Sequence, residues 1–453
     1  MAQSSFKENR RFRDERIFAI FKGCQKRLLK RHPAAIDVMG KGLHVITACE
    51  VCGNEKLVSV LDLGLHPMCD DLVRVGDKRV CREYPIEILF CENCVTGHQR
   101  FQVPKHELFP ASYHYRSRFT ADVINGMAGL VDSCEQRFGD FGGKKVLDIG
   151  CNDGSLLDFF RKKGAITVGI EPTDAYRDAE QKGHIVFNDY LSEEVAGLVA
   201  ASHGKPDFIT FTNVFAHIED LREVLGALKR LMAPHTIIVI ENHYLGAVLD
   251  GNQFDTFYHE HPRTYSYTSF VHMAGCLDAR LMDVEFPSRY GGNIRVFMGM
   301  GTEGSGKDHI ERSDLSDRES GFFEDFALLR GNIAHWREAK KRFLAVQVRK
   351  HGKLRAKAFP GRAAILVKLL GLNEESISAV YEKPGSLKIG HYLPGTRIPI
   401  HSDEDLFALP DKALPLLNLA WHIPREIRSY MTEHGYSGPI IDVLSTEDFV
   451  SVR

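Results

Sequence analysis

Four cysteines form two C-x-x-C pairs in the first hundred residues, Cys49 with Cys52 and Cys91 with Cys94. Two such pairs can supply the four thiolates of one tetrahedral zinc site. The 38 residues between Cys52 and Cys91 exceed the spacing of a minimal zinc ribbon, but they suit short strands folded around one ion. Because a four-thiolate site has no open coordination position, we predict a structural Zn²⁺ without a catalytic role. Four free buried cysteines are the alternative, and nearby substitutes for a ligand are Cys69, Cys81, His66 and His98.

A glycine-bearing turn follows an apolar segment, in the order Asp148-Ile-Gly150-Cys151-Asn152-Asp153-Gly154. Glycine allows the backbone to approach a ligand closely and to take positive φ. Glu171 comes 21 residues after Gly150, where an acidic side chain can accept hydrogen bonds from both ribose hydroxyls of a nucleoside. A dinucleotide-binding turn would instead read G-x-G-x-x-G to hold a pyrophosphate. The polar side chains between the two glycines favour S-adenosylmethionine, which carries no phosphate.

The predicted cofactor site extends to the ends of the neighbouring strands. Asp189 could reach the adenine amino group, although a role as a helix N-cap is an equal alternative. Asn213 should face the same edge of the sheet. The residues that we expect to bind the cofactor are Asp148, Gly150, Cys151, Asn152, Asp153, Gly154, Glu171, Asp189 and Asn213.

A cluster of histidine, glutamate and tyrosine residues occupies positions 254–267 and includes Tyr258, Glu260 and His261. His217 follows an earlier predicted strand. In a parallel α/β sheet, ligands bind outside the carboxyl ends of the strands, so these side chains should converge near the transferable methyl group. A histidine beside a carboxylate is a natural general base. A second metal site and a purely structural network are the alternatives.

Five short segments rich in β-branched residues would position these side chains. They alternate with helical patterns, which predicts a parallel sheet covered by helices on both faces. We therefore expect an α/β fold with a Rossmann-like core of the class I methyltransferase type. The predicted strands are residues 144–150, 165–171, 184–189, 206–213 and 235–242. A charged segment at 301–320 is predicted to be a loop, and a long helix should follow at 321–354.

The chain has 453 residues, which is more than one ordinary core, and a formal net charge of −2. Residues 1–45 form a basic extension, whose first 35 residues carry ten Lys and Arg against three Asp and Glu. This extension is predicted to be a solvated tail, with a helix that docks on a partner subunit and an organelle transit peptide as the alternatives. The absence of a secretory signal and of a long apolar run favours a cytoplasmic protein without a membrane span. The near-neutral charge opposes a nucleic-acid partner, and the oligomeric state stays open.

Nine stretches, in one order, resemble the bacterial sugar C-methyltransferases that act on nucleotide-linked ketodeoxysugars. These enzymes combine a zinc module, a cofactor-binding core and a C-terminal α/β domain, which implies boundaries here of 46–118, 119–300 and 301–453. The matching stretches are CEVCGNEKLVSVLDLGLHPMCDDL, YPIEILFCENC, YHYRS, VLDIGCNDGSLL, GIEPT, FTNVFAHIED, FDTFYHEHPRTYS, YGGNIRV and IGHYLPGTRIPI.

The resemblance also implies roles for single residues. It places the base at His261, with Tyr258 and Glu260 as neighbours and His217 in support, and a catalytic tyrosine at Tyr113 or Tyr115. The implied substrate is a small molecule, a nucleotide-linked sugar. Two segments depart from the family pattern, namely Pro262-Arg263-Thr264 after the histidine cluster and Pro360-Gly361-Arg362-Ala363 in place of an AKG-type turn, with Glu382 in place of an aspartate.

The departures leave other activities open. The same histidine could deprotonate a hydroxyl or amine, which would make the protein an O- or N-methyltransferase of a sugar or related metabolite. A nucleic-acid methyltransferase with a zinc knuckle is supported only by the basic extension. A binding protein without catalysis would not need the intact histidine cluster and Glu171.

Overall fold

The computed structural model describes residues 42–110, 113, 115–301 and 312–452, and side chains at 290 and 450–452 are not described. The chain divides into two compact units, Met1–His44 and Val45–Arg453, and of the first only strand residue His44 enters the description below. The helix predicted within the basic extension falls outside the described residues. No described helix is both long and apolar enough to cross a membrane.

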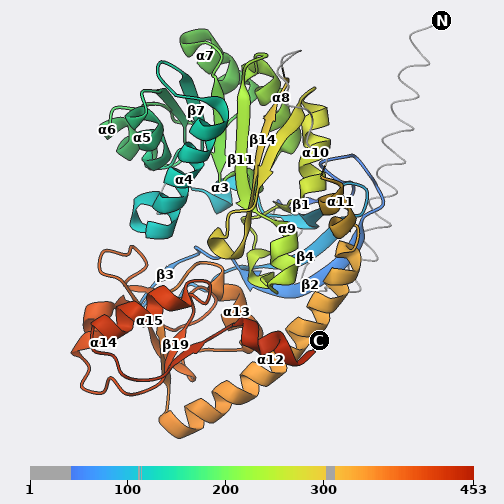
Figure 1. Cartoon of the computed structure of the whole chain (residues 1–453). Coiled ribbons are helices and arrows are strands. Elements are labelled where there is room, and N and C mark those ends of the chain that lie inside the picture. Colours follow the sequence, from blue (N-terminus) through green and yellow to red (C-terminus); the bar gives the residue numbers. More distant parts are fainter. Residues whose placement is uncertain (1–41, 111–112, 114, 302–311, 453) are drawn as a thin grey trace, which may run out of the picture. The chain divides into compact units, whose positions relative to one another are not determined.

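A seven-stranded sheet forms the centre of the cofactor-binding core (Figure 1). Its strand order is β13-β14-β11-β10-β7-β8-β9. The five predicted strands are present and parallel to one another, as β7 (Lys145–Ile149), β8 (Ile166–Ile170), β9 (Ile185–Phe187), β10 (Phe208–Thr212) and β11 (Ile237–His243). Two further strands, β13 (Arg280–Glu285) and β14 (Asn293–Gly299), close the β11 edge, and β14 runs antiparallel to both β11 and β13.

Helices cover both faces of this sheet because alternate strand residues point to opposite sides. Val146, Val239 and Phe297 pack on one face against α4 (Ala121–Phe138) and α5 (Ser155–Lys162). Leu147, Ile209 and Ile240 belong to the larger core on the other face. The helices of that core include α7 (Glu193–His203), α8 (Leu221–Leu231) and α10 (Tyr267–Cys276), while α6 (Tyr176–Gln181) and α9 (Leu245–Asp250) are short connecting helices.

The cysteine-bearing region folds around an antiparallel sheet of order β12-β5-β4-β2. Three of its strands come from this region, β2 (Val58–Pro67), β4 (Glu83–Cys91) and β5 (Thr96–Gln99), while β12 (Arg263–Thr264) comes from the histidine cluster of the core. The remaining short elements are β1 (His44–Val45), β3 (Val73–Arg74), β6 (Phe101–Gln102), α3 (Lys105–Leu108) and the 3-10 turn η1 (Ser117–Phe119).

The C-terminal region contains a parallel five-stranded sheet of order β18-β16-β15-β19-β20 (orange to red in Figure 1). Its strands are β15 (Leu354–Lys357), β16 (Ile377–Glu382), β18 (Ile400–Ser402), β19 (Leu416–Asn418) and β20 (Ile440–Asp442). The long helix α12 (Phe322–His351) lies where it was predicted, and the other helices are α13 (Ala363–Leu370), α14 (Asp403–Ala408) and α15 (Pro424–Glu433). Strand β17 (His391–Tyr392) pairs with β3 of the cysteine-bearing region.

The loop predicted at 301–320 is wrong for its second half, which forms helix α11 (Ser313–Glu319). The helix forms because one acidic residue of this charged segment, Glu319, is buried and not exposed to solvent. Glu319 accepts hydrogen bonds from the Tyr244 hydroxyl at 2.9 Å and from the Tyr267 and Thr268 amides at 2.7 and 2.9 Å. It therefore satisfies amides at the start of α10, which would otherwise be unpaired.

Candidate active site and zinc site

The four predicted zinc ligands converge. Their Sγ atoms all lie within 4.8 Å of one another, and the Cys49–Cys94 and Cys52–Cys91 pairs are 3.4 and 3.6 Å apart. A Zn–S bond of about 2.3 Å places tetrahedral sulfurs about 3.8 Å apart, so the thiols are already spaced for zinc. The substitute ligands are used elsewhere or lie outside the cluster; His66, for example, contacts the Leu63 carbonyl at 3.0 Å.

We call the segment that carries the ligands Cys49 and Cys52 the zinc knuckle. A largely buried ion pair joins it to the histidine cluster at 254–267. Glu50, between two zinc ligands, contacts Arg263 Nη1 at 2.6 Å, and Arg263 is fully buried. Arg263 also donates to the Tyr265 hydroxyl at 3.0 Å. Its positive charge is among the causes that lower the pKa of Glu50 to about 2 despite burial. Because β12 pairs with β5 at the same place, the zinc knuckle fixes the C-terminal end of the histidine cluster.

A cavity of about 630 Å³ lies at the carboxyl ends of the parallel strands. The residues that line the cavity come from the cofactor-binding core, from the segment before that core, which includes Tyr113, and from the C-terminal region. Of the predicted site residues, those that line it are Tyr113, Tyr115, Asp148, Gly150, Cys151, Asn152, Glu171, Asp189, Asn213, His217, Tyr258, Glu260 and His261. The predicted cofactor and catalytic residues thus share one cavity, whereas Asp153 and Gly154 do not line it.

Glu171 is fixed at the end of β8 by its neighbours. Its Oε2 accepts from the Asn152 amide at 2.9 Å, and its Oε1 accepts from both the amide and the hydroxyl of Thr173, at 2.9 and 2.6 Å. Since a carboxylate has about four acceptor positions, Oε2 can accept one further bond from a ligand. Burial raises the pKa of Glu171, and these hydrogen bonds oppose that rise.

Asp148 and Gly150 line the end of the cavity at which we predicted the cofactor. Asp148 accepts from the Thr210 hydroxyl at 2.7 Å, and burial raises its pKa to about 7. Gly150 has φ +67, and a Cβ there would come within 2.7 Å of a Val214 methyl. The turn therefore needs glycine both for its backbone conformation and for the space beside the cavity, which fits the close approach of a nucleoside.

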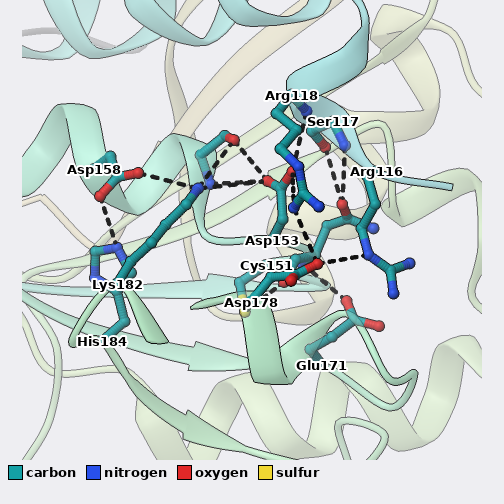
Figure 2. A network of polar contacts seen from close by, with 12 residues as sticks. Arg116, Ser117, Arg118, Cys151, Asp153, Asp158, Glu171, Asp178, Lys182 and His184 are labelled. Carbon is teal, nitrogen blue, oxygen red and sulfur yellow. Dashed lines mark hydrogen bonds and ion pairs between the residues drawn. The ribbon is translucent and has the colours of Figure 1, made fainter. Parts of the chain in front are cut away.

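Residues 115–118, which we call the strap, are tied to the glycine turn by hydrogen bonds. Figure 2 shows Arg116, Ser117 and Arg118 of the strap beside Asp153 of the turn. The Asn152 side chain donates to the Tyr115 carbonyl at 3.1 Å and accepts from the Ser117 amide at 3.0 Å. Asp153 accepts from the Arg118 amide at 3.0 Å and also from Ser155 at the start of α5. The two polar side chains between the glycines therefore hold the strap across the turn.

Asp178 of α6 completes the fastening of the strap. It contacts Arg116 Nε at 2.8 Å and Arg118 Nη1 at 3.0 Å. The two guanidinium groups lower the pKa of Asp178 against the opposing effect of burial. The composition of the glycine turn did not predict this role for α6.

Asp189 and Asn213 line the cavity from the next two strand ends. Asp189 is exposed, and its side chain accepts from the adjacent Tyr190 amide at 2.7 Å. The alternative that Asp189 caps a helix is wrong, because Ser192 caps α7 by accepting from the Val195 amide. Asn213 adopts φ +55, and its side chain accepts from Asn293 at 3.4 Å.

His261 is held by one ring nitrogen on the cavity wall. Its Nδ1 lies 3.0 Å from the Thr256 carbonyl, to which only a protonated nitrogen can donate. That bond leaves Nε2 as the unprotonated nitrogen, with no hydrogen-bond partner among the described side chains. Burial, followed by the neighbouring His217 and His243, lowers the pKa of His261 well below its ordinary value of 6.5. The neutral imidazole is thus the stable form at physiological pH.

Aromatic rings surround this imidazole. The ring centroids of Tyr258, His217 and His243 lie 4.3, 4.8 and 5.5 Å from that of His261. His217 Nδ1 donates to the Glu260 carbonyl at 2.7 Å, and burial lowers the pKa of His217 to about 4. The rings therefore pack as neutral groups around the predicted base.

Glu260 faces a second carboxyl group, Asp70, which the sequence did not indicate as part of the site. Burial and the charge of Asp70 raise the pKa of Glu260 well above its ordinary value. Tyr113 donates to Glu260 Oε2 at 3.4 Å. Because burial and the neighbouring negative charge favour its protonated form, Glu260 is suited to donate a hydrogen bond at neutral pH.

The C-terminal region, from which we expected contacts to a sugar nucleotide, adds Arg362 to the cavity wall, a residue that was not among the predicted site residues. Arg362 lies 3.2 Å from Asp255 Oδ2 through Nε, and Trp421 Nε1 donates to the same oxygen at 2.8 Å. Arg362 Nη1 also reaches the Thr256 hydroxyl at 3.2 Å. The departure of residues 360–363 from the family turn was the available signal, because it placed a charged residue beside the cavity.

Family models match the three regions. A methyltransferase domain matches residues 114–277, a zinc binding domain 49–109, and a C-methyltransferase C-terminal domain 288–440. The chain is also 29% identical over 175 residues to a ubiquinone biosynthesis O-methyltransferase of Psychrobacter cryohalolentis, 36% of this chain and 67% of that protein. The solved magnesium protoporphyrin IX methyltransferase of Synechocystis PCC 6803 covers 40% of this chain and 80% of its own, with 15% identity and a TM-score of 0.30, too low to support an inference.

A longer similarity identifies the family. The chain is 30% identical over 396 residues to the C-methyltransferase NovU of Streptomyces niveus, which covers 84% of this chain and 91% of that protein. The match therefore includes far more than the cofactor-binding core. Together with the matches to a zinc binding domain and to a C-methyltransferase C-terminal domain, it shows that the chain belongs to the zinc-containing, S-adenosylmethionine-dependent C-methyltransferases.

Proposed function

We propose that this methyltransferase acts on a carbon next to the ketone of a nucleotide-linked sugar, with His261 as the base. The observation that carries the proposal is the fixed tautomer of His261, whose Nδ1 is held by the Thr256 carbonyl. The opposite nitrogen, which carries the lone pair, belongs to a ring on the cavity wall. The family resemblance and the C-methyltransferase relative support carbon as the acceptor atom.

The residues around His261 suit the removal of a weakly acidic proton. Nε2 of His261 would take the proton from the carbon, and the imidazolium would be stabilised through its Nδ1–H bond to Thr256. The charge that develops on the ketone oxygen needs hydrogen-bond donors fixed in advance. Burial raises the pKa of both Tyr258 and Tyr113 well above the ordinary value, so both remain hydroxyls. Tyr258 can donate to the ketone oxygen, whereas Tyr113 donates to Glu260 and would position it.

The cofactor end of the cavity would orient the second reactant. Asp148, Gly150 and Glu171 would hold S-adenosylmethionine, which supplies an electrophilic methyl group when bound. The strap carries Tyr115 along the same wall, and its bonds to Asn152 would fix the distance between the two ends of the cavity. Such positioning can supply several kcal/mol of a barrier, because the reacting atoms must meet at about 3–3.5 Å.

The nucleotide carrier is proposed from the charge of the C-terminal wall. Lys383 and Lys388 line the cavity there, and Glu382 is the one carboxylate that the described part of this region adds to the wall. Cationic groups of this kind suit the phosphates that link a sugar to a nucleoside.

The test is a panel of nucleotide-linked ketosugars incubated with the enzyme and S-adenosylmethionine. We expect one member to gain a methyl group by mass spectrometry, and deuterium from solvent to enter the same carbon when the cofactor is omitted. His261→Gln should lower kcat by about 10²–10⁴-fold and abolish deuterium entry, because a base contributes about that much. Turnover by His261→Gln at the wild-type rate would exclude the base role. Methylation of a hydroxyl or amine instead would exclude the carbon acceptor.

A further inference from the structure

Asn242, at the carboxyl end of β11, is a buried amide on the cavity wall whose polar atoms are not used by the protein. Its side chain is 1% exposed, and neither Oδ1 nor Nδ2 has a hydrogen-bond partner within the described part of the chain. Each unsatisfied buried polar group costs about 1–3 kcal/mol. Since native proteins pair nearly all such groups, the missing partners are expected from a bound molecule.

Two residues of the C-terminal wall have the same property. Arg362 Nη2 and His422 Nδ1 are buried without a hydrogen-bond partner within residues 42–110, 113, 115–301 and 312–452, and both residues line the cavity. Arg362 lies close enough to His261 and His422 for its charge to contribute to the lowered pKa of both. The open positions of Arg362 and His422 therefore belong to the end of the cavity that contains the proposed base. Asn242 directly precedes His243 on β11, and the ring centroid of His243 lies 5.5 Å from that of His261.

The donor and acceptor pattern indicates the kind of group that fits. The Asn242 amide has an oxygen that accepts and an NH₂ group that donates, so a bound group must both give and receive hydrogen bonds to satisfy it. A carboxylate or a phosphate has only acceptors at neutral pH and would leave Asn242 Oδ1 unsatisfied. The charge of Arg362 is already balanced by Asp255 at 3.2 Å, which removes the need for an anion at this position. A hydroxyl group meets both requirements.

We propose that Asn242, Arg362 and His422 form a subsite for a ring hydroxyl of the acceptor, so that the preferred substrate is a ketosugar that keeps a hydroxyl beside the reacting region. The inference rests on the proposed function, because it assumes that a sugar ring occupies this cavity. The proposed substrate differs from the deoxysugars that the family resemblance implies. We attribute this difference in part to Arg362, which belongs to the segment at 360–363 that departs from the family turn.

The experiment compares two nucleotide-linked ketosugars that differ in a single ring hydroxyl, one hydroxylated and one deoxy. Sites built to bind a substrate hydroxyl reject the analogue that lacks it by factors up to about 10⁴–10⁵. We expect wild-type kcat/KM to favour the hydroxylated sugar by at least about a hundredfold. Asn242→Leu should reduce that ratio to about tenfold or less, mainly by lowering kcat/KM for the hydroxylated sugar. Arg362→Met should act in the same direction.

Two further measurements separate a binding role from a structural one. Asn242→Leu removes unsatisfied groups, so its melting temperature without ligand should equal or exceed that of the wild type. The matched control is Asn332→Leu on α12, which removes an amide that bonds to Asn252 at 2.7 Å and lies outside the cavity wall. We expect this control to keep the wild-type ratio. A fall in melting temperature for Asn242→Leu, beyond that of the control, would assign Asn242 a structural role and overturn the subsite.

Calorimetric binding of both sugars, without cofactor, tests the subsite independently of turnover. The hydroxylated sugar should bind wild type more tightly than the deoxy sugar, and Asn242→Leu should remove most of the difference. Equal binding of the two sugars to wild type overturns the subsite, although carbon methylation could still stand. A hydroxyl preference without any methylation supports the subsite and instead counts against the proposed reaction.

Discussion

At the scale of single residues, the site depends on polar groups whose neighbours change their usual protonation. His261 is neutral because burial and adjacent imidazoles disfavour its charge, and its Nδ1 bond decides which nitrogen faces a substrate. The sequence predicted the histidine and its neighbours Tyr258 and Glu260. It did not predict Asp70 or Asn242, because no local pattern shows which distant loops bring a second carboxyl or an unpaired amide to the same wall.

The pH dependence of activity should report the lowered pKa of His261. A base works in its unprotonated form, so lowering its pKa extends activity toward acid rather than toward alkali. We expect kcat/KM to stay level as the pH falls from 8 through 6.5, the ordinary histidine pKa, and to decline only below it. The measurement is the pH profile of kcat/KM for the methylated ketosugar, with circular dichroism to confirm folding at each pH. Half-maximal activity at or above pH 6.5 would contradict this.

At the scale of elements, the strap and the zinc knuckle position the two ends of the cavity. The order and approximate ends of the parallel strands were predictable from β-branched segments and turn residues, because these patterns are local. The antiparallel strand β14 was not predicted, nor was β12, whose two residues pair with a strand that lies about 165 positions earlier in the chain. Short strands of this kind are specified by tertiary contacts and leave no periodic signal.

The strap should loosen when Asp178 loses its charge. Asp178→Asn weakens contacts to Arg116 and Arg118 that are partly exposed, so each is worth about 0.2–1 kcal/mol. We expect kcat/KM to fall by about three- to tenfold, because Tyr115 and Asn152 lose their fixed alignment. Asp158→Asn is the matched control, since Asp158 pairs with Lys182 and His184 in the same network but not with the strap (Figure 2). Equal effects of the two variants on steady-state kinetics would refute a role for the strap.

Loss of the zinc ion should lower activity, because the zinc knuckle supports the histidine cluster through the ion pair between Glu50 and Arg263. Cys91→Ser removes one thiolate ligand, which should lower the metal content from about one zinc per chain and destabilise the knuckle that carries Glu50. We expect methyl transfer to fall in step with zinc content, as measured by elemental analysis and activity on the same samples. Full activity in a zinc-free protein with native circular dichroism would show that the knuckle does not support the histidine cluster.

At the scale of the whole molecule, residues from distant parts of the chain enclose one cavity. The fold class and the order of the regions were predictable, because each has its own composition and motif. Their contacts were not, since the ion pair of Arg362 with Asp255 joins positions more than a hundred residues apart. Asp255 lies within the histidine cluster, but nothing in the sequence there indicates a partner in the C-terminal region.

Removing the charge of Asp255 should strongly weaken the contact between the histidine cluster and Arg362 of the C-terminal region. Asp255→Asn leaves Arg362 buried without its counter-charge, and breaking a buried pair in this way costs about 3–5 kcal/mol. We expect a lower midpoint of urea unfolding and a higher KM for the sugar, with little change in the Kd for S-adenosylmethionine at the opposite end. Trp421→Phe removes only one hydrogen bond to Asp255 and should have a smaller effect. A variant as stable as wild type would show that the pair is solvated.

The pairing of β12 with β5 also has a consequence for modularity. Because a core segment completes the sheet of the zinc-binding region, that region is not a cassette that can be exchanged at the boundary near residue 118. A chimera of two relatives cut there would join a β5 from one parent to a β12 from the other, and would mismatch Glu50 with the residue at 263. A functional exchange should therefore transfer residues 263–265 together with the zinc-binding region, although the two segments are not continuous in the chain.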